Sequence, residues 1–167
     1  MTFFEKFNEQ MNFEFESAYI YRTMAAYMAE MDLDGFENFF DMQVKEEIIH
    51  AEDFKNTLQR LGKKVKYRPI DPGKAEFTDI LDVFKKALEH EELVSSKIKE
   101  LYEESLEQPE RYITVFLQKY LNEQVEEEET FTKLITQLER IDGNWAGIYQ
   151  LNALLSNRPA PQANPNN

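Results

Sequence analysis

The chain contains four long segments with an apolar stripe at helical spacing, and an acidic residue interrupts each of these stripes near its middle. The glycines and prolines stand in short groups between the segments and leave the segments themselves unbroken. Lysine and arginine are missing from all four stripes. A chain of this kind must bury acids inside a helical bundle, and something must compensate their charge.

The segments between the helix breakers predict four long helices and one short helix. Thr2 and Glu5 have the spacing of a capping box at the start of the first segment. Gly62 is a natural left-handed end for the second. The predicted helices run over Phe3–Asp32, Gly35–Leu61, Thr78–Glu107, Pro109–Asp142 and Trp145–Leu155.

The lengths of the connections predict the topology. Very short links join the first helix to the second and the third to the fourth, so each pair is antiparallel. The 16 residues from Gly62 to Phe77 reach about 53 Å when extended, whereas a helix of the second segment's length is only about 40 Å long. We therefore expect an all-α four-helix bundle with one long crossover connection and a short fifth C-terminal helix. This domain covers residues 1–157, and a flexible tail covers 158–167.

The inward acids fall at similar depths in the predicted bundle. Counted from the hairpin turns, Glu91 and Glu127 are level within roughly 3 Å, and Glu14, Glu47 and His50 agree within roughly 5 to 9 Å. Four buried carboxylates without partners would cost more than the whole stability of an ordinary domain. A bound cation compensates all of them, and carboxylates with one imidazole suit Fe(II), Mn(II) or Zn(II). Glu47 is placed to bridge two ions.

Several neighbouring residues allow more than one interpretation. Tyr21 fits an ordinary core tyrosine, although it lies two turns from Glu14 and could give the site a hydrogen bond or an electron. His50 alone would be a satisfied core histidine, and His90, off the stripe, is expected at the surface. Three further acids flank the inward positions and could form an accessory acidic patch beside Glu127: Glu46, Glu123 and Glu126.

Composition excludes several classes of function. Without cysteine there are no disulfides, thiolate metal sites or cysteine nucleophiles. The net charge of -13 would repel nucleic acid and attract cations. No basic leader precedes an apolar stretch, and no long apolar run occurs. We therefore expect a cytoplasmic protein that has no nucleic-acid partner and no membrane partner.

Three motifs carry a resemblance to a known family. They are Asn8–Glu14 in the first helix, Glu46–His50 in the second and Asn122–Glu127 in the fourth. At these residues the chain resembles the ferritins, most closely the non-haem bacterial type, and the similarity extends from Asn8 to about Leu155. The same di-iron class is a known example of a carboxylate bundle.

The resemblance implies a set of iron ligands. Glu14, Glu47 and His50 would hold a first iron ion, and Glu47, Glu91 and Glu127 a second. Gln124 would lie near the dioxygen side. The resemblance also implies a third nearby site formed by Glu46, Glu123, Glu126 and Glu127.

Departures from related families narrow the resemblance. Thr130 stands where bacterioferritins and rubrerythrin-like peroxidases have a second histidine, and Ile48 stands where bacterioferritins have the haem methionine, so no haem is expected. Lys119 stands where many ferritins have a tryptophan, which puts electron donation from that position in doubt. The segment from Trp145 onward resembles the fifth helix that lines a symmetry axis of a 24-subunit shell.

The spacing of the acids together with the resemblance implies an iron-storage and detoxification ferritin with ferroxidase activity. It would oxidise Fe(II) with dioxygen or peroxide inside each subunit and keep Fe(III) mineral in a homo-oligomeric cage of 24 subunits. One alternative is a discrete di-iron oxidase or peroxidase without mineral storage. Another is a purely structural bundle with protonated or hydrated acids, in which Glu47→Ala would stabilise the metal-free protein and leave metal binding unchanged.

Overall fold

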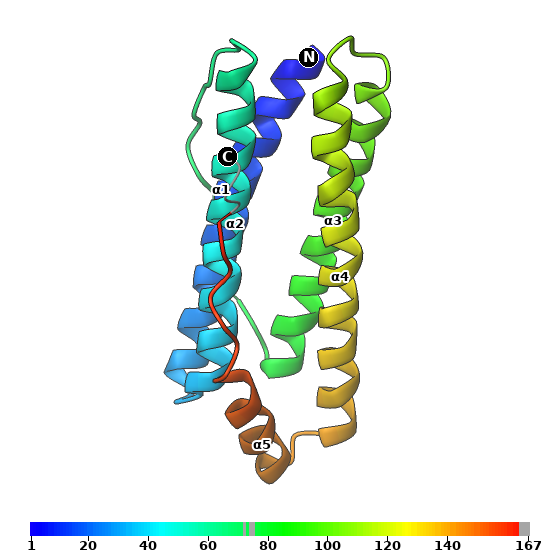
Figure 1. Ribbon diagram of the computed structural model, residues 1–167. Coiled ribbons are helices and arrows are strands. Elements are labelled where there is room, and N and C mark those ends of the chain that lie inside the picture. The colour runs from blue at the N-terminus through cyan, green and yellow to red at the C-terminus, as the bar shows by residue number, and fades with distance from the viewer. Residues whose placement is uncertain (72, 74–75, 164–167) are drawn as a thin grey trace.

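The computed structural model describes residues 1–71, 73 and 76–163, and their regular secondary structure is entirely helical (Figure 1). Four long helices and one short helix follow one another in the order predicted from the sequence. Their bounds are α1 Phe3–Glu30, α2 Asp34–Arg60, α3 Ile80–Ser105, α4 Arg111–Ile141 and α5 Trp145–Leu155. None of the helices in the described part of the chain is long and apolar enough to cross a membrane.

The helices form two antiparallel pairs, α1 with α2 and α3 with α4 (Figure 1). The segment after α2 runs back along the bundle before α3 begins, so α2 and α3 point the same way. This is the predicted four-helix bundle with one long crossover and a short C-terminal helix. The flexibility predicted for 158–167 stays a prediction, and 164–167 lie outside the described residues.

The helix ends follow local sequence signals. Thr2 and Glu5 form the predicted capping box, each side chain bonded to the backbone N–H of the other residue. Gly62 follows α2 with φ +65°, the left-handed conformation expected there. Asp79 caps α3 by accepting from the backbone N–H of Asp82. α4 begins at Arg111, slightly later than predicted.

Two asparagines of α1 hold the crossover segment against the bundle. The side-chain amides of Asn8 and Asn12 both donate to the carbonyl oxygen of Lys66, at 2.8 and 2.9 Å. Their side-chain oxygens accept from the backbone N–H groups of Lys66 and Arg68. The crossover therefore satisfies its own backbone by using side chains of α1.

The short helix α5 packs across the start of α2. The side-chain oxygen of Asn152 accepts from the backbone N–H groups of Gly35 and Phe36, at 2.8 and 3.1 Å. This contact caps α2, whose own N-cap residue Leu33 makes no side-chain cap. A Cβ atom at Gly35 would lie 1.7 Å from the carbonyl oxygen of Asn152, so glycine is required for the close approach.

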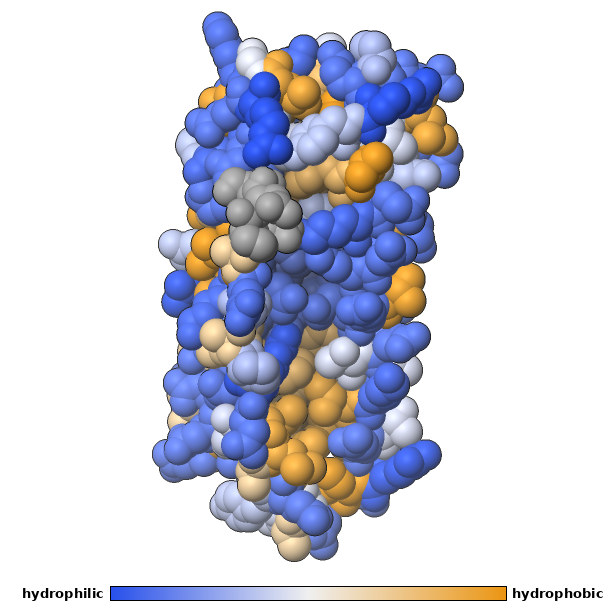
Figure 2. Space-filling model, in the orientation of Figure 1, coloured by the Kyte–Doolittle hydropathy of each residue, from blue (hydrophilic) through white to orange (hydrophobic). Residues whose placement is uncertain are grey.

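The interior consists of two apolar clusters with a polar layer between them. One cluster lies toward the α5 end and includes Tyr21, Phe40 and Phe131; the other includes Phe7 and Phe54. The side of the molecule shown in Figure 2 is mostly hydrophilic, with an apolar area toward α5. The polar layer between the clusters contains the candidate site.

Candidate metal centre

All four long helices contribute a carboxyl or carboxamide group to the polar layer. Glu47 and His50 lie three residues apart on α2 and share one face. Glu14 comes from α1 and Glu91 from α3, and these two acids are each 1% exposed. α4 supplies Gln124 and Glu127, again three residues apart.

Glu14, Glu47 and His50 form the part of the layer with the geometry of a metal site. Each offers one potential ligand atom, and these atoms all lie within 4.8 Å of one another. All three side chains are buried. The Nδ1 atom of His50 lies 3.6 Å from Oε2 of Glu47. The sequence-predicted ligands of the first ion are therefore together.

Two buried carboxylate oxygens of this group lack an ordinary partner. Gln10 donates to Oε1 of Glu14 at 2.7 Å, but no amide, hydroxyl or basic group of the described residues donates to Oε2 of Glu14 or to Oε2 of Glu47. The two carboxyl groups lie within hydrogen-bond reach of each other, which requires a proton on one of them. Leaving such atoms unsatisfied costs about 1–3 kcal/mol each. Oxygen lone pairs beside an imidazole are ligands that a divalent iron ion accepts, so the donor set fits the predicted metal.

Hydrogen bonds hold Glu91 and Glu127 in place. Tyr21 donates its hydroxyl to Oε1 of Glu91, and Gln124 donates its amide to Oε2 at 2.9 Å. Gln43 donates its amide to Oε2 of Glu127 at 3.0 Å. Tyr21 thus makes a hydrogen bond to the site, one of the two roles that the sequence left open for it.

The electrostatics of the layer favour a bound cation. Burial, followed by repulsion from neighbouring carboxylates, raises the pKa values of Glu14 and Glu47 well above their ordinary range. Burial also raises the pKa of Glu91, and it raises that of Glu127 to about 7. The metal-free layer therefore binds protons more tightly than exposed carboxyl groups do, and a metal ion would displace them.

The three accessory acids have separate surroundings. Glu46 pairs with Arg158, whose Nη2 lies 3.1 Å from Oε2 of Glu46. Glu123 reaches Nε2 of His50 and the amino group of Lys119, both at 3.5 Å. Glu126 is exposed on α4.

His90 differs from the sequence-based expectation of a surface residue. It is partly buried, and its Nε2 lies 2.8 Å from the hydroxyl of Ser17. It packs against the rings of Phe13 and Tyr21. Burial lowers the pKa of His90 to about 4. The expectation considered only the main apolar stripe of α3. His90 lies beside that stripe, where α3 packs against α1.

Sequence reasoning missed Gln10, Gln43 and Arg158. Both glutamines are buried. Gln43 stands on the apolar stripe of α2 one turn before Glu47, so a polar residue on that stripe was an available signal, whereas Gln10 lies beside the stripe of α1. Arg158 follows α5, and no periodicity connects it to the site.

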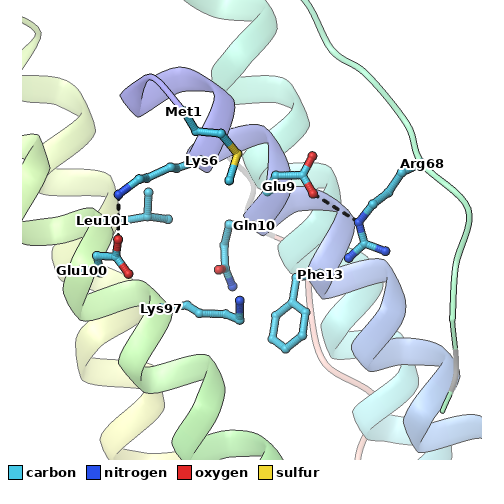
Figure 3. A pocket seen from close by; sticks show the side chains of 9 residues that line it. All are labelled: Met1, Lys6, Glu9, Gln10, Phe13, Arg68, Lys97, Glu100 and Leu101. Carbon is cyan, nitrogen blue, oxygen red and sulfur yellow. Dashed lines mark hydrogen bonds and ion pairs between the residues drawn. The ribbon is translucent and has the colours of Figure 1, made fainter.

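A separate cavity lies outside the metal-binding layer, between α1 and α3. It has a volume of about 190 Å³ and is lined by Gln10, Phe13 and Lys97 among others. Figure 3 shows Gln10 directed between the two helices, with ion pairs of Lys6 with Glu100 and Glu9 with Arg68 at the rim. Because Gln10 also donates to Glu14, its amide separates this cavity from the centre.

Comparisons with known proteins agree with this architecture. The family model described as "Ferritin-like domain" matches residues 4–141. The curated bacterial non-heme ferritin of Staphylococcus aureus is 37% identical over 146 residues, which cover 87% of each chain. The corresponding protein of Staphylococcus haemolyticus is 36% identical over the same share.

Solved structures show the same fold. A closed form of the Archaeoglobus fulgidus ferritin, engineered by site-directed mutagenesis, matches with a TM-score of 0.92 and 32% identity, covering 96% of this chain and 99% of that one. A humanized archaeal ferritin matches with a TM-score of 0.93 and 30% identity, covering 97% and 99%. The chain therefore belongs to the ferritin family, within its non-haem bacterial type.

Proposed function

We propose that this ferritin oxidises Fe(II) at the centre inside each subunit and stores the Fe(III) product as mineral within a hollow shell of 24 subunits in the cytoplasm. The observation that carries the proposal is the buried group of Glu14, Glu47 and His50, whose ligand atoms lie within 4.8 Å of one another. Family membership supports iron as the metal. The similarity to bacterial non-heme ferritins supports a centre without haem.

Two iron ions would be bound as substrates in the polar layer. Glu14, Glu47 and His50 would bind the first, and Glu47, Glu91 and Glu127 the second. Tyr21 and Gln124 would keep the Glu91 carboxylate oriented through the hydrogen bonds that they donate to it. Such outer partners fix the direction of a ligand and tune its basicity.

The redox reaction balances with dioxygen as the oxidant. Two Fe(II) ions give up one electron each, dioxygen takes both electrons with two protons, and hydrogen peroxide leaves. If peroxide is the oxidant, the same two electrons and two protons convert it into two water molecules. Carboxylates stabilise the ferric product because hard anionic oxygen ligands prefer the higher charge.

The net charge of -13 favours the delivery of iron. A negative field around the subunit raises the local concentration of Fe(II), an effect that weakens as salt increases. Oxidised iron would then leave the centre for the interior of the shell, where mineral grows.

The test follows Fe(II) oxidation and oxygen consumption together in the assembled protein. We expect two Fe(II) ions oxidised for each dioxygen consumed when two ions per subunit are added. Glu47→Gln removes the shared ligand and should slow oxidation at least about a hundredfold, because even outer partners of a metal commonly account for 10- to 100-fold. Glu129→Gln, a change at an exposed acid of α4, is the matched control and should leave the rate unchanged.

Two results would reject the proposal. If Glu47→Gln oxidises Fe(II) as fast as the unmodified protein, the buried layer is not the oxidation site. If the unmodified protein is a small species, not a shell, and retains only a few iron ions per subunit, the chain is a discrete di-iron oxidase.

A further inference from the structure

The chain after α5 returns along α2 (Figure 1). Arg158, on this returning segment, lies beside Glu46 at the edge of the metal centre. Asn38 anchors this return by donating its amide to the carbonyl oxygens of Leu155 and Arg158, at 3.2 and 3.4 Å. The guanidinium then lies against α2. Its Nη1 donates to the carbonyl oxygen of Phe39 at 3.0 Å, and its Cζ lies 4.4 Å from the centre of the Phe39 ring.

The other side of the guanidinium faces the acids. Its Nη2 donates to Oε2 of Glu46 at 3.1 Å and to the side-chain oxygen of Gln43. Gln43 is fully buried, and its amide nitrogen donates to Glu127 at 3.0 Å. Because the guanidinium takes the oxygen of Gln43, only the amide nitrogen remains to face Glu127. Arg158 therefore fixes the orientation of the group that holds Glu127.

The guanidinium supplies a positive charge beside Glu46, one of the acids that a third cation would need. It carries five hydrogen-bond donors, no acceptor and a permanent positive charge. Like a metal ion, it can therefore compensate the charge of a carboxylate and bind its oxygen atoms. Oε2 of Glu46 already accepts from it, and Oε2 of Glu127 already accepts from Gln43. A divalent ion beside Glu46 would lie close to a fixed positive charge and be repelled by it.

A second acid of the patch, Glu123, also lies beside basic side chains. Its Oε1 lies 3.5 Å from the amino group of Lys119, and its Oε2, which accepts no hydrogen bond from the described residues, lies 3.5 Å from Nε2 of His50. A cavity of about 120 Å³ remains between Glu46, His50, Glu123 and Lys119, and Pro161 and Gln162 of the C-terminal segment close one side of it. The same segment that carries Arg158 thus covers the part of the patch that Glu46 and Glu123 form, while Glu126 is exposed.

We propose that Arg158 is the built-in counter-ion of the accessory acidic patch, where it takes the place of a third metal ion and positions Gln43 against Glu127. The centre then holds two metal ions tightly in each subunit. Arg158 is a positioning residue that acts through Glu46 and Gln43. This inference rests on the proposed function, since it concerns the number of ions at the same centre.

The test is a calorimetric titration of the metal-free, assembled, full-length protein with Zn²⁺, which binds such ligands without redox chemistry. The unmodified protein should bind two tight Zn²⁺ ions per subunit. Arg158→Gln should bind a third, with an affinity at least about tenfold above that of any third ion in the unmodified protein. Adding Glu46→Gln to Arg158→Gln should remove the third ion again.

Two further variants separate charge from folding. Arg140→Gln removes an exposed arginine of α4 and matches the change in net charge, so it should still bind two ions. Arg158→Lys keeps the positive charge but loses the forked donor, so it should also bind two ions. In that variant the Co²⁺ absorption spectrum of the loaded centre should change, because Gln43 no longer fixes Glu127.

The outcomes distinguish this inference from the proposed function. If Arg158→Gln binds two ions like the unmodified protein, or if Arg158→Lys gains a third, the counter-ion role is wrong and the proposed function stands. If the unmodified protein already binds three ions tightly, the inference is likewise wrong. If the unmodified protein binds no Zn²⁺, the proposed metal centre itself fails.

Discussion

The acids of the centre differ in how their carboxyl groups are held. Both oxygens of Glu91 accept hydrogen bonds, from Tyr21 and Gln124. Glu14 and Glu47 each keep one buried oxygen without an amide, hydroxyl or basic donor among the described residues. One half of the centre is therefore oriented before metal arrives, and the other half has lone pairs available for the ion.

The hydroxyl of Tyr21 can be tested without disturbing the packing of its ring. Tyr21→Phe keeps the stacked ring but leaves Oε1 of Glu91 without its donor, so we expect a loss of about 1–3 kcal/mol in the free energy of unfolding of the metal-free protein. Denaturant unfolding measures this change. Tyr19→Phe, at an exposed tyrosine, is the control. An unchanged stability in Tyr21→Phe would show that the hydrogen bond contributes nothing.

The buried acids also predict how the stability of the metal-free protein depends on pH. The pKa of Glu127 rises from 4.5 to about 7 on folding, and burial raises those of Glu14, Glu47 and Glu91 as well. The folded protein then binds more protons than the unfolded chain, so these groups stabilise most at low pH and lose that contribution as pH rises. His90 has the opposite effect between about pH 4 and pH 6.5. Its pKa falls on folding, so its contribution to stability increases as the pH rises through this interval.

Above pH 6.5 the contribution of His90 to stability no longer changes with pH. The carboxyl groups then determine how the stability depends on pH. We expect the melting temperature of the metal-free protein to fall between pH 6.5 and about pH 8, and bound Zn²⁺ to reduce or reverse that fall, because metal binding replaces the protons. Calorimetric melting at the two pH values tests this. If the melting temperature of the metal-free protein rises over this interval, the raised pKa values of the buried carboxyl groups are wrong.

At the scale of helices, the sequence predicted what local signals determine. The capping box of Thr2 and Glu5 and the left-handed Gly62 are short-range patterns, and both appear as expected. The docking of α5 on α2 was not predicted. Asn152 and Gly35 are more than a hundred residues apart, and a contact at that separation leaves no periodic pattern in one sequence.

Gly35 provides the sharpest test of this docking. The Cβ atom of Gly35→Ala would overlap the carbonyl oxygen of Asn152, so α5 must shift; overpacking of this kind costs about 1–3 kcal/mol. We expect a lower melting temperature and faster proteolysis after Leu155. Asn152→Ala removes the cap without the overlap and should cost about 1 kcal/mol. Equal stability of Gly35→Ala and the unmodified protein would contradict the close contact.

At the scale of the whole molecule, connection lengths and buried acids were enough to predict the bundle. Two short links and one long crossover left a single topology, and the acids on four stripes predicted the polar layer between two apolar clusters. Side-chain detail was beyond this reasoning. The bond from Arg158 to Glu46 joins the end of the chain to the centre, and it depends on how α5 turns the chain back.

The predicted shell of 24 subunits rests on the family resemblance. The stripes of one chain describe its own interior and contain no signal for a subunit interface. Storage therefore has to be tested on the assembled particle, where capacity and size are measured together.

The most direct test adds a large excess of Fe(II) in air, separates the protein by size-exclusion chromatography and counts the iron in each fraction. The proposal predicts a very large particle that retains tens or more iron ions per subunit, far beyond the ions that the centre can ligate. A small species that retains only two or three ions per subunit would contradict storage and identify a discrete di-iron enzyme. Protein fractions that retain no iron would contradict the metal centre altogether.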